Sequence, residues 1–392
     1  MSFAVLALIC AVALLGPLFS LQKLVRMPVV IPELLVGVAL GATGFGLLDA
    51  RDPTFTFLAD DIGFALVMFV AGSHVPLRSE GLRRGMRSGL LRAAAVGVLA
   101  VPAGFGVAHL FGTGNGALYA VIIASSSASI VMPSLEGIPL QAPPVVSMLV
   151  QLAVADAACI VLLPLAIAPG EAASRALGAA VVLACAYLVY LFLAWAERSG
   201  RRRRVHVVSE ERGLALELRT SLVILFTLSA IAHALGVSVM LAGFAAGLAV
   251  AAMGEPRRLA KQLFALTEGF FGPLFFVWLG ASIDLNAVLR SPSLLVLGVV
   301  LGLTAATVHG VMALTGQPLS LALSTCAQLG VPVAAASLGR GAGVLAPGED
   351  ASMLVGALVT VFVTAAVSSA VERVARAGAR PEVAAAPGAA TS

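Results

Sequence analysis

The chain has 392 residues, of which 60% are apolar and 11% are charged, and its formal net charge is +4. Average soluble domains carry about 25% charged residues, so this composition excludes an ordinary soluble protein. Apolar stretches of about 20 residues, long enough for a helix to cross a bilayer, recur from the first residues to Val371. We therefore predict an all-α polytopic membrane protein.

In chain order, these stretches predict 13 membrane-spanning helices. They cover residues 3–20, 29–48, 56–75, 88–111, 115–135, 145–168, 173–196, 214–235, 237–253, 263–282, 293–314, 319–340 and 352–371. The first is expected to be a retained helix and not a secretory signal. Its basic residues, Lys23 and Arg26, follow the apolar run, whereas those of a signal peptide precede it.

Basic residues gather in alternate loops between these helices. If the N-terminus lies outside, the inside loops hold Lys23, Arg26, Arg78, Arg83, Arg84, Arg87, Arg198, Arg201 to Arg204, Arg257, Arg258, Lys261, Arg373, Arg376 and Arg380, and the outside loops hold Arg51, Arg175, Arg290 and Arg340. This asymmetry follows the positive-inside rule. It predicts an outside N-terminus and a cytoplasmic C-terminus in a bacterial cytoplasmic membrane. The basic loops are interpreted as topology anchors or, for residues 201–204, as a contact for anionic lipid, and no nucleic-acid partner is expected.

Two of the predicted helices carry helix-breaking residues at matching places in two opposed six-helix halves. The fifth helix contains Ser125 to Ser129 and then Pro133, and the twelfth contains the run Gln328, Leu329, Gly330, Val331 and Pro332. Interrupted helices at corresponding positions of inverted repeats are typical of transport sites near the midplane of the bilayer. Two ordinary proline kinks are the alternative.

The sixth helix contains one acidic residue deep in its apolar run, Asp156. An ionised carboxylate at that depth costs a few kcal/mol or more, so the group is stable when it is protonated or when it holds a cation. Such a choice suits an antiporter, and we predict that Asp156 carries both the proton and a monovalent metal cation. A permanently protonated Asp156 that is hydrogen-bonded between helices is the alternative.

A second ionisable residue, His309, lies deep in the eleventh helix. Because histidine changes charge near neutral pH, His309 is a candidate for compensating the charge of Asp156 when the cation leaves. A neutral histidine that only packs and hydrogen-bonds in the bundle is equally open.

Several segments resemble one family over about residues 25–370. They are MPVVIPELLVGVALGATGFGLL in the second helix, ASSSASIVMPSLEG in the fifth, GFFGPLFFVWLGASIDL in the tenth and AQLGVPVAAASLG in the twelfth. These segments are similar to those of the monovalent cation:proton antiporter-2 family, which includes bacterial sodium/proton antiporters and potassium-efflux proteins with a sodium/hydrogen exchanger domain.

The resemblance implies the sodium/proton antiporter fold, with 13 helices, inverted repeats, two broken crossing helices and a scaffold that dimerises. It implies scaffold and dimerisation helices at 1–80, core helices at 85–170, a linker helix and basic cytoplasmic loop at 171–212, scaffold helices at 213–290, core helices at 291–375 and a disordered cytoplasmic tail at 376–392. The core is expected to carry the site across the membrane in an elevator motion against the scaffold of a homodimer.

The resemblance also implies the site. The essential aspartate of the family falls on Asp156, and the polar groups of its first broken helix fall near Ser126, Ser127 and Ser129. The second broken helix contributes Gln328, Gly330 and Pro332.

Two departures from the family pattern shape the expected activity. Ala155 stands where electrogenic members carry a second acidic residue, and His309 stands near the position of their lysine. A single carboxylate predicts electroneutral exchange of Na⁺, K⁺ or Li⁺ for protons, with no cofactor beyond the transported ions. A cation channel or uniporter-like pathway and an organic-anion symporter on the same scaffold are the alternatives. No nucleophile–base pair or metal motif is found, so an enzyme is not expected.

Overall fold

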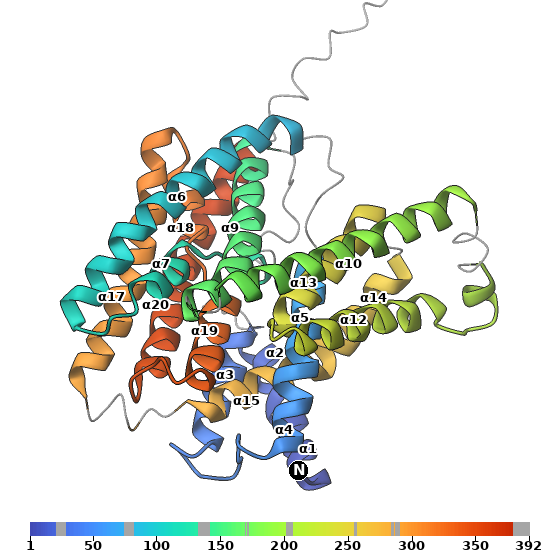
Figure 1. The fold of residues 1–392 in the computed structure, drawn as a ribbon, viewed down its shortest axis with the longest axis horizontal. Helices are drawn as coiled ribbons and strands as arrows, with labels where there is room; N and C mark the ends of the chain where they lie inside the picture. Colours follow the sequence, from blue (N-terminus) through green and yellow to red (C-terminus); the bar gives the residue numbers. More distant parts are fainter. Residues whose placement is uncertain are drawn as a thin grey trace, which may run out of the picture. The chain divides into compact units, whose positions relative to one another are not determined.

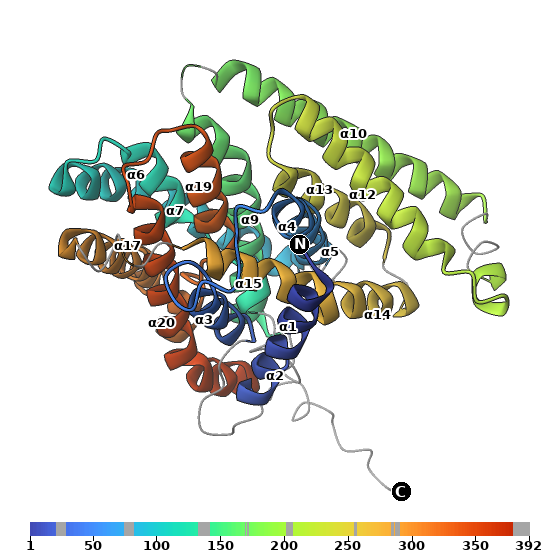
Figure 2. The ribbon, with the colours of Figure 1, turned by 90° about the horizontal axis from the view of Figure 1, so that it is seen from below.

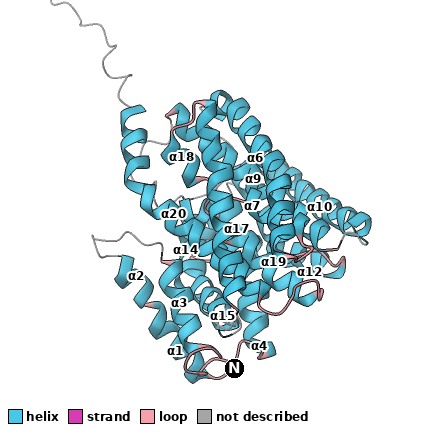
Figure 3. Ribbon diagram, turned by 90° about the vertical axis from the view of Figure 1, so that its left-hand side faces the viewer, coloured by secondary structure: helices cyan, strands magenta, loops and turns pink. Residues whose placement is uncertain are grey.

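The structure of the protein is a computed structural model, which describes residues 1–20, 29–73, 82–131, 142–168, 170, 172–200, 207–254, 257–283, 286 and 291–378. All regular secondary structure in this part of the chain is helical (Figure 3). The predicted all-α class is therefore confirmed for the residues described.

The helices follow the predicted order along the chain. They are α1 (Phe3–Ala13), α2 (Leu15–Ser20), α3 (Val30–Leu40), α4 (Pro53–Thr56), the π-helix η1 (Phe57–Gly63), α5 (Phe64–Ser73), α6 (Leu82–Phe111), α7 (Gly116–Ala124), α8 (Ala128–Val131), α9 (Pro143–Ile167), α10 (Ala172–Arg198), α12 (Leu216–Ala234), α13 (Val239–Met253), α14 (Arg257–Leu266), the π-helix η4 (Thr267–Phe271), α15 (Gly272–Ser282), α17 (Pro292–Gly310), the 3₁₀-helix η5 (Val311–Thr315), α18 (Leu319–Ser324), α19 (Gly330–Gly341) and α20 (Glu349–Gly378).

Eight of these helical stretches are both long and apolar enough to cross a membrane. They are Pro53–Ser73, Gly85–Phe111, Pro143–Ile167, Ala173–Arg198, Leu216–Ala234, Leu259–Ser282, Pro292–Thr315 and Glu349–Ala377. Shorter apolar helices cover Phe3–Leu18 and Val239–Met253. The protein is thus a multi-pass membrane protein, and the count of 13 spans stays a prediction.

Two helix boundaries correct the prediction. The second predicted helix, 29–48, ends at Leu40, because the chain turns back at Gly41 and the carbonyl of Leu40 accepts the N–H groups of Leu47 and Leu48, both at 2.9 Å. At the other end of the chain, α20 continues to Gly378. The predicted tail therefore begins at least three residues too early, and the remainder of that tail lies outside the described residues.

The chain divides into two compact units. Unit 1 comprises Met1–Arg78, Ile160–Leu295 and Val333–Ser352, and unit 2 comprises Ser79–Cys159, Val296–Pro332 and Met353–Ser392. We describe each by itself. The assignment of scaffold and core roles to particular segments stays a prediction.

Glycines bring α5 and α13 of unit 1 into close contact (Figure 1). A Cβ atom at Gly243 would lie well under 3.0 Å from the carbonyl oxygen of Ala65. A Cβ atom at Gly247 would also lie well under 3.0 Å from the carbonyl oxygen of Phe69. The two glycines are four residues apart and so share one face of α13. Small residues at this spacing allow membrane helices to pack backbone against backbone.

The same device joins α3 and α15, which lie side by side in Figure 2. Gly37 of α3 packs against the backbone of Val277, and Gly280 of α15 packs against the backbone of Leu34. A hydrogen bond also joins α15 to the loop that follows α3. The indole of Trp278 donates to the carbonyl of Ala50 at 3.0 Å.

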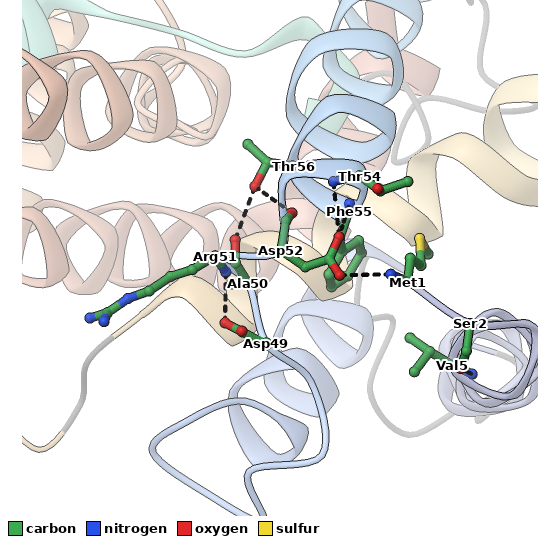
Figure 4. Close-up of polar contacts among 10 residues, drawn as sticks. All are labelled: Met1, Ser2, Val5, Asp49, Ala50, Arg51, Asp52, Thr54, Phe55 and Thr56. Atoms are coloured by element: carbon green, nitrogen blue, oxygen red, sulfur yellow. Dashed lines mark hydrogen bonds and ion pairs between the residues drawn. The ribbon is translucent and has the colours of Figure 1, made fainter.

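A carboxylate cap starts α4 (Figure 4). Oδ1 of Asp52 accepts the backbone N–H groups of Thr54 and Phe55 at 2.9 and 3.0 Å, which satisfies donors at a helix start. Oδ2 accepts from the Met1 ammonium group at 2.6 Å, and this contact holds the pKa of the Asp52 carboxyl below its ordinary value. The start of α1 is thereby tied to the start of α4.

Unit 2 uses the same close helix packing. Gly104 of α6 lies against the backbone of Ala120 on α7, and Gly302 of α17 lies against the backbone of Gly356 on α20. Figure 1 shows α6 and α7 running side by side. These pairs place the broken helices, described next, among well-packed neighbours.

Candidate functional site: two interrupted helices and a buried carboxyl group

Both predicted helix breaks are present in unit 2. The first leaves Ser125 to Ser127 non-helical between α7 and α8, and the second leaves residues 325–329 outside α18 and α19. Gly330 and Pro332 lie in the first turn of α19, directly after the second break. Proline is tolerated there, since the first N–H groups of a helix have no partner within it. Pro133 lies outside the described residues.

The two breaks contact each other through hydrogen bonds. Ser126 Oγ, from the first break, donates to the carbonyl oxygen of Thr325, in the second, at 2.6 Å. In the opposite direction, Gln328 Nε2 donates to the carbonyl oxygen of Ile123 at 3.4 Å, and its backbone N–H donates to Thr360 Oγ1 at 3.2 Å. Backbone groups freed by one break thus find partners in the other, as non-helical backbone at membrane depth requires.

Asp156 lies on α9 within the same unit and is 6% exposed. Among the described residues, no hydrogen bond or ion pair reaches its carboxyl group. Burying an ionised carboxylate without a partner is very costly, so this group needs either a proton or a bound cation. This requirement agrees with the prediction for Asp156, whose role as the carrier stays a prediction.

The structure describes the side chains of two of the three predicted serine ligands. Ser126 and Ser127 are both buried, at 1% and 4% exposure, in the non-helical segment of the first break. Ser129 lies in α8, and its side chain is outside the description. The single hydrogen of the Ser126 hydroxyl is directed at Thr325, which leaves lone pairs on Oγ that can face a cation.

The ring of His309 is completely buried and forms two hydrogen bonds. Its Nδ1 lies 2.8 Å from Thr325 Oγ1, and its Nε2 lies 3.2 Å from the carbonyl oxygen of Ile123. The imidazole therefore bridges the two breaks. Compensation of the Asp156 charge by His309 stays a prediction.

Three polar residues that the sequence interpretation missed complete this network. Gln317 Nε2 donates to Gln151 Oε1 at 3.1 Å, and Gln151 Nε2 donates to Thr325 Oγ1 at 3.2 Å. All three side chains are at most 3% exposed. The sequence does show uncharged amides and hydroxyls inside apolar helices. Such groups could have predicted the network, because polar side chains in membrane helices often form hydrogen bonds to neighbouring helices.

The oxygen-rich chemistry of this region suits a hard monovalent cation. It offers one carboxyl group, hydroxyl groups and backbone carbonyl oxygens, the ligand types that hard cations prefer. In the part of the chain that the structure describes, no cluster of three or more His, Cys, Asp or Glu residues is found. A tightly held transition metal is therefore not indicated by these residues.

Comparison with known proteins places the chain among ion exchangers. The sequence profile of the sodium/hydrogen exchanger transmembrane family matches residues 10–371. The Bacillus subtilis protein named "Putative Na(+)/H(+) antiporter YjbQ" is 25% identical over 314 residues, which cover 76% of this chain and 50% of that protein. The chain thus spans about half the length of this relative. The Na⁺/H⁺ antiporter of Enterococcus hirae is 27% identical over 269 residues, covering 66% of this chain and 68% of that protein.

A solved structure has the same fold. The sodium proton antiporter MjNhaP1 from Methanocaldococcus jannaschii superposes with a TM-score of 0.63 at 15% sequence identity, covering 96% of this chain and 98% of that one. At this identity the likeness concerns the fold, and it bears out the predicted architecture at that level.

Proposed function

The chain belongs to the sodium/hydrogen exchanger family, and we propose that it is a secondary antiporter that exchanges a monovalent cation, Na⁺, K⁺ or Li⁺, for protons. The single observation that carries this proposal is the buried carboxyl group of Asp156, which has no hydrogen-bond or ion-pair partner among the residues that the structure describes, in the unit that contains both helix breaks. The names of the curated relatives support the same activity. We place the protein in a bacterial cytoplasmic membrane, with the N-terminus outside.

Asp156 acts as the shared carrier in this proposal. The carboxyl group is stable in the apolar interior when it holds a proton or when a cation neutralises it, and competition between the two couples their movements. Because Ala155 precedes it, one carboxyl group is available per site. One proton then exchanges for one cation, and the exchange is electroneutral.

Alternating access is proposed to occur by an elevator motion in which the core helices, at 85–170 and 291–375, move and the remaining helices serve as a dimeric scaffold. Helix ends at the breaks direct their dipoles and freed carbonyl groups toward the site. The proposed cation ligands are Asp156, Ser126, Ser127 and Ser129. No cofactor beyond the transported ions takes part.

A flux experiment tests the proposed exchange. Purified protein is reconstituted into proteoliposomes that contain a pH-sensitive dye, and Na⁺, K⁺, Li⁺ or choline is added at several pH values. We expect the pH of the lumen to change when a gradient of an inorganic cation is imposed. The direction of this change should reverse when the gradient is reversed, and choline should produce no change. Cation current without proton movement would instead indicate a channel, and flux that requires an organic anion would indicate a symporter.

Electroneutrality gives a separate prediction. With Na⁺ as the substrate, a membrane potential imposed by a K⁺ gradient and valinomycin should leave the initial rate of exchange unchanged, because a one-for-one exchange moves no net charge. The dye assay with and without valinomycin measures this. A rate that rises or falls with the sign of the imposed potential would contradict a one-to-one ratio while leaving antiport itself intact.

The hydroxyl of Ser126 provides a graded prediction. Ser126→Ala should raise the apparent KM for the cation by about fivefold, since a buried hydrogen bond and a ligand oxygen worth about 1 kcal/mol are lost. Ser368→Ala is the matched control, because Ser368 Oγ donates to the carbonyl of Ala365, within its own helix α20. Equal KM values for the two variants would remove Ser126 from the ligand set.

A further inference from the structure

The side chain of Thr325 is the meeting point of the buried network in unit 2. Its hydroxyl oxygen lies 2.7 Å from the carbonyl oxygen of Ala322, 2.8 Å from His309 Nδ1 and 3.2 Å from Gln151 Nε2. Its carbonyl oxygen accepts from Ser126 Oγ at 2.6 Å. The residue is completely buried, so water does not compete for these contacts.

Counting hydrogens shows what this arrangement demands of His309. A hydroxyl group has one hydrogen and two lone pairs. The carbonyl of Ala322 takes the hydrogen, and the amide nitrogen of Gln151 occupies one lone pair, because Gln151 Oε1 already accepts from Gln317. The remaining lone pair faces His309 Nδ1 when that nitrogen carries the ring hydrogen, and the hydroxyl hydrogen turns to Nδ1 when it does not.

The other ring nitrogen faces an acceptor as well. His309 Nε2 lies 3.2 Å from the carbonyl oxygen of Ile123, which has no hydrogen to give. A neutral ring with its hydrogen on Nε2 makes both contacts when the Thr325 hydroxyl donates to Nδ1 in place of the Ala322 carbonyl. A ring with hydrogen on both nitrogens would be a buried charge, which is very costly without a partner.

The elements joined at Thr325 are those that build the site. Gln151 lies on α9 five residues before Asp156, Ser126 belongs to the first break, and Thr325 itself belongs to the second. Titratable residues on the contacting elements are Tyr119 of α7, Asp156 and Cys159 of α9, and Cys326 beside Thr325. Among the described residues, none forms an ion pair with the ring.

We propose that Thr325 is a positioning residue of the exchange reaction, whose hydroxyl group and backbone carbonyl hold the two breaks, His309 and the helix of Asp156 in one register. This inference rests on the proposed antiport. It gives His309 a role as a bridge between the breaks, in addition to any effect on Asp156.

Thr325→Val tests the role of the hydroxyl, because it preserves the branched shape and the backbone carbonyl. In the flux assay we expect an apparent KM for the cation that rises by about fivefold, the size expected when a buried hydrogen bond worth about 1 kcal/mol is lost. Thr325→Ser, which restores the hydroxyl, should return the KM to that of the wild type.

Thr307→Val is the matched control, because Thr307 is exposed on α17 and its hydroxyl donates within that helix, to the carbonyl of Leu303 at 2.8 Å. Gln151→Met removes the link to α9 while leaving Thr325 in place, and it decides the question if Thr325→Val does not fold. A raised KM in Gln151→Met supports the proposal. A wild-type KM in Thr325→Val, or in Gln151→Met as its substitute, overturns it.

A spectroscopic measurement is independent of transport. Nitrogen-15 NMR of histidine-labelled protein, with the His309 signals assigned from His309→Gln, should show a ring Nδ1 shift that differs between the wild type and Thr325→Val, because Nδ1 loses its contact with the hydroxyl. Identical ring-nitrogen shifts in the two proteins contradict the inference. Absence of cation-driven proton flux in the wild type contradicts the proposed antiport instead, so the two failures are distinguishable.

Discussion

Asp156→Asn should abolish cation-driven proton exchange in proteoliposomes. The amide has nearly the shape of the carboxyl group, but it neither takes up a proton near neutral pH nor neutralises a cation in the apolar interior. Both halves of the exchange therefore lose their carrier at once. The dye assay under Na⁺, K⁺ and Li⁺ gradients measures the loss, with the amount of folded, reconstituted protein determined in parallel.

Asp49→Asn is the matched control for this variant. Asp49 is an exposed acidic residue of unit 1 whose Oδ1 accepts the backbone N–H of Arg51 at 2.9 Å. The same chemical change there should leave the flux at the wild-type level. If Asp156→Asn retains that level too, the carrier is a different residue and the proposed mechanism is wrong.

Gly247→Ala should lower the free energy of unfolding by about 1–3 kcal/mol, the usual cost of forcing extra atoms into a packed interior. The new Cβ would lie 2.8 Å from the backbone nitrogen of Ser73 and closer still to the carbonyl of Phe69. Backbone atoms do not rotate away as a flexible side chain does, so α5 and α13 must separate. Denaturant titration in mixed micelles measures the change.

Gly97→Ala is the control for that substitution. Gly97 lies within α6, and a Cβ atom there meets nothing within 4 Å. Alanine favours the helix over glycine by up to about 1 kcal/mol, so this variant should be as stable as the wild type or more so. A Gly247→Ala protein with equal stability would show that the helix pair relaxes without cost.

The fold could be predicted to a large extent because a membrane-spanning helix requires a long run of apolar residues, which is visible in the sequence. Long apolar runs such as α9 and α10 were located to within a few residues at each end. Where the prediction failed, local chemistry overrode hydropathy. Residues 41–48 are apolar enough for a helix, yet Gly41, Gly44 and Gly46 let the chain fold back on the end of α3.

The candidate site was predicted only in part. A charged residue such as Asp156 is conspicuous in an apolar helix, and so are the serines of the first break. The hydrogen-bond network around Thr325 was not predicted, since a threonine in an apolar run does not indicate which residues it contacts. Those partners lie 16 and 174 residues away in sequence, at His309 and Gln151. Pairings over such distances depend on how the helices cross, which periodicity does not report.

The glycine contacts of α5 with α13 and of α3 with α15 also bear on motion. In each pair, backbone atoms of one helix occupy the notches left by missing side chains on the other. Sliding by a fraction of a turn would drive carbonyl oxygens into neighbouring residues, so these helices cannot shear past one another without first coming apart. Unit 1 is therefore interlocked at these crossings. A force applied to one helix of a pair is transmitted to the other helix with little deformation of the contact.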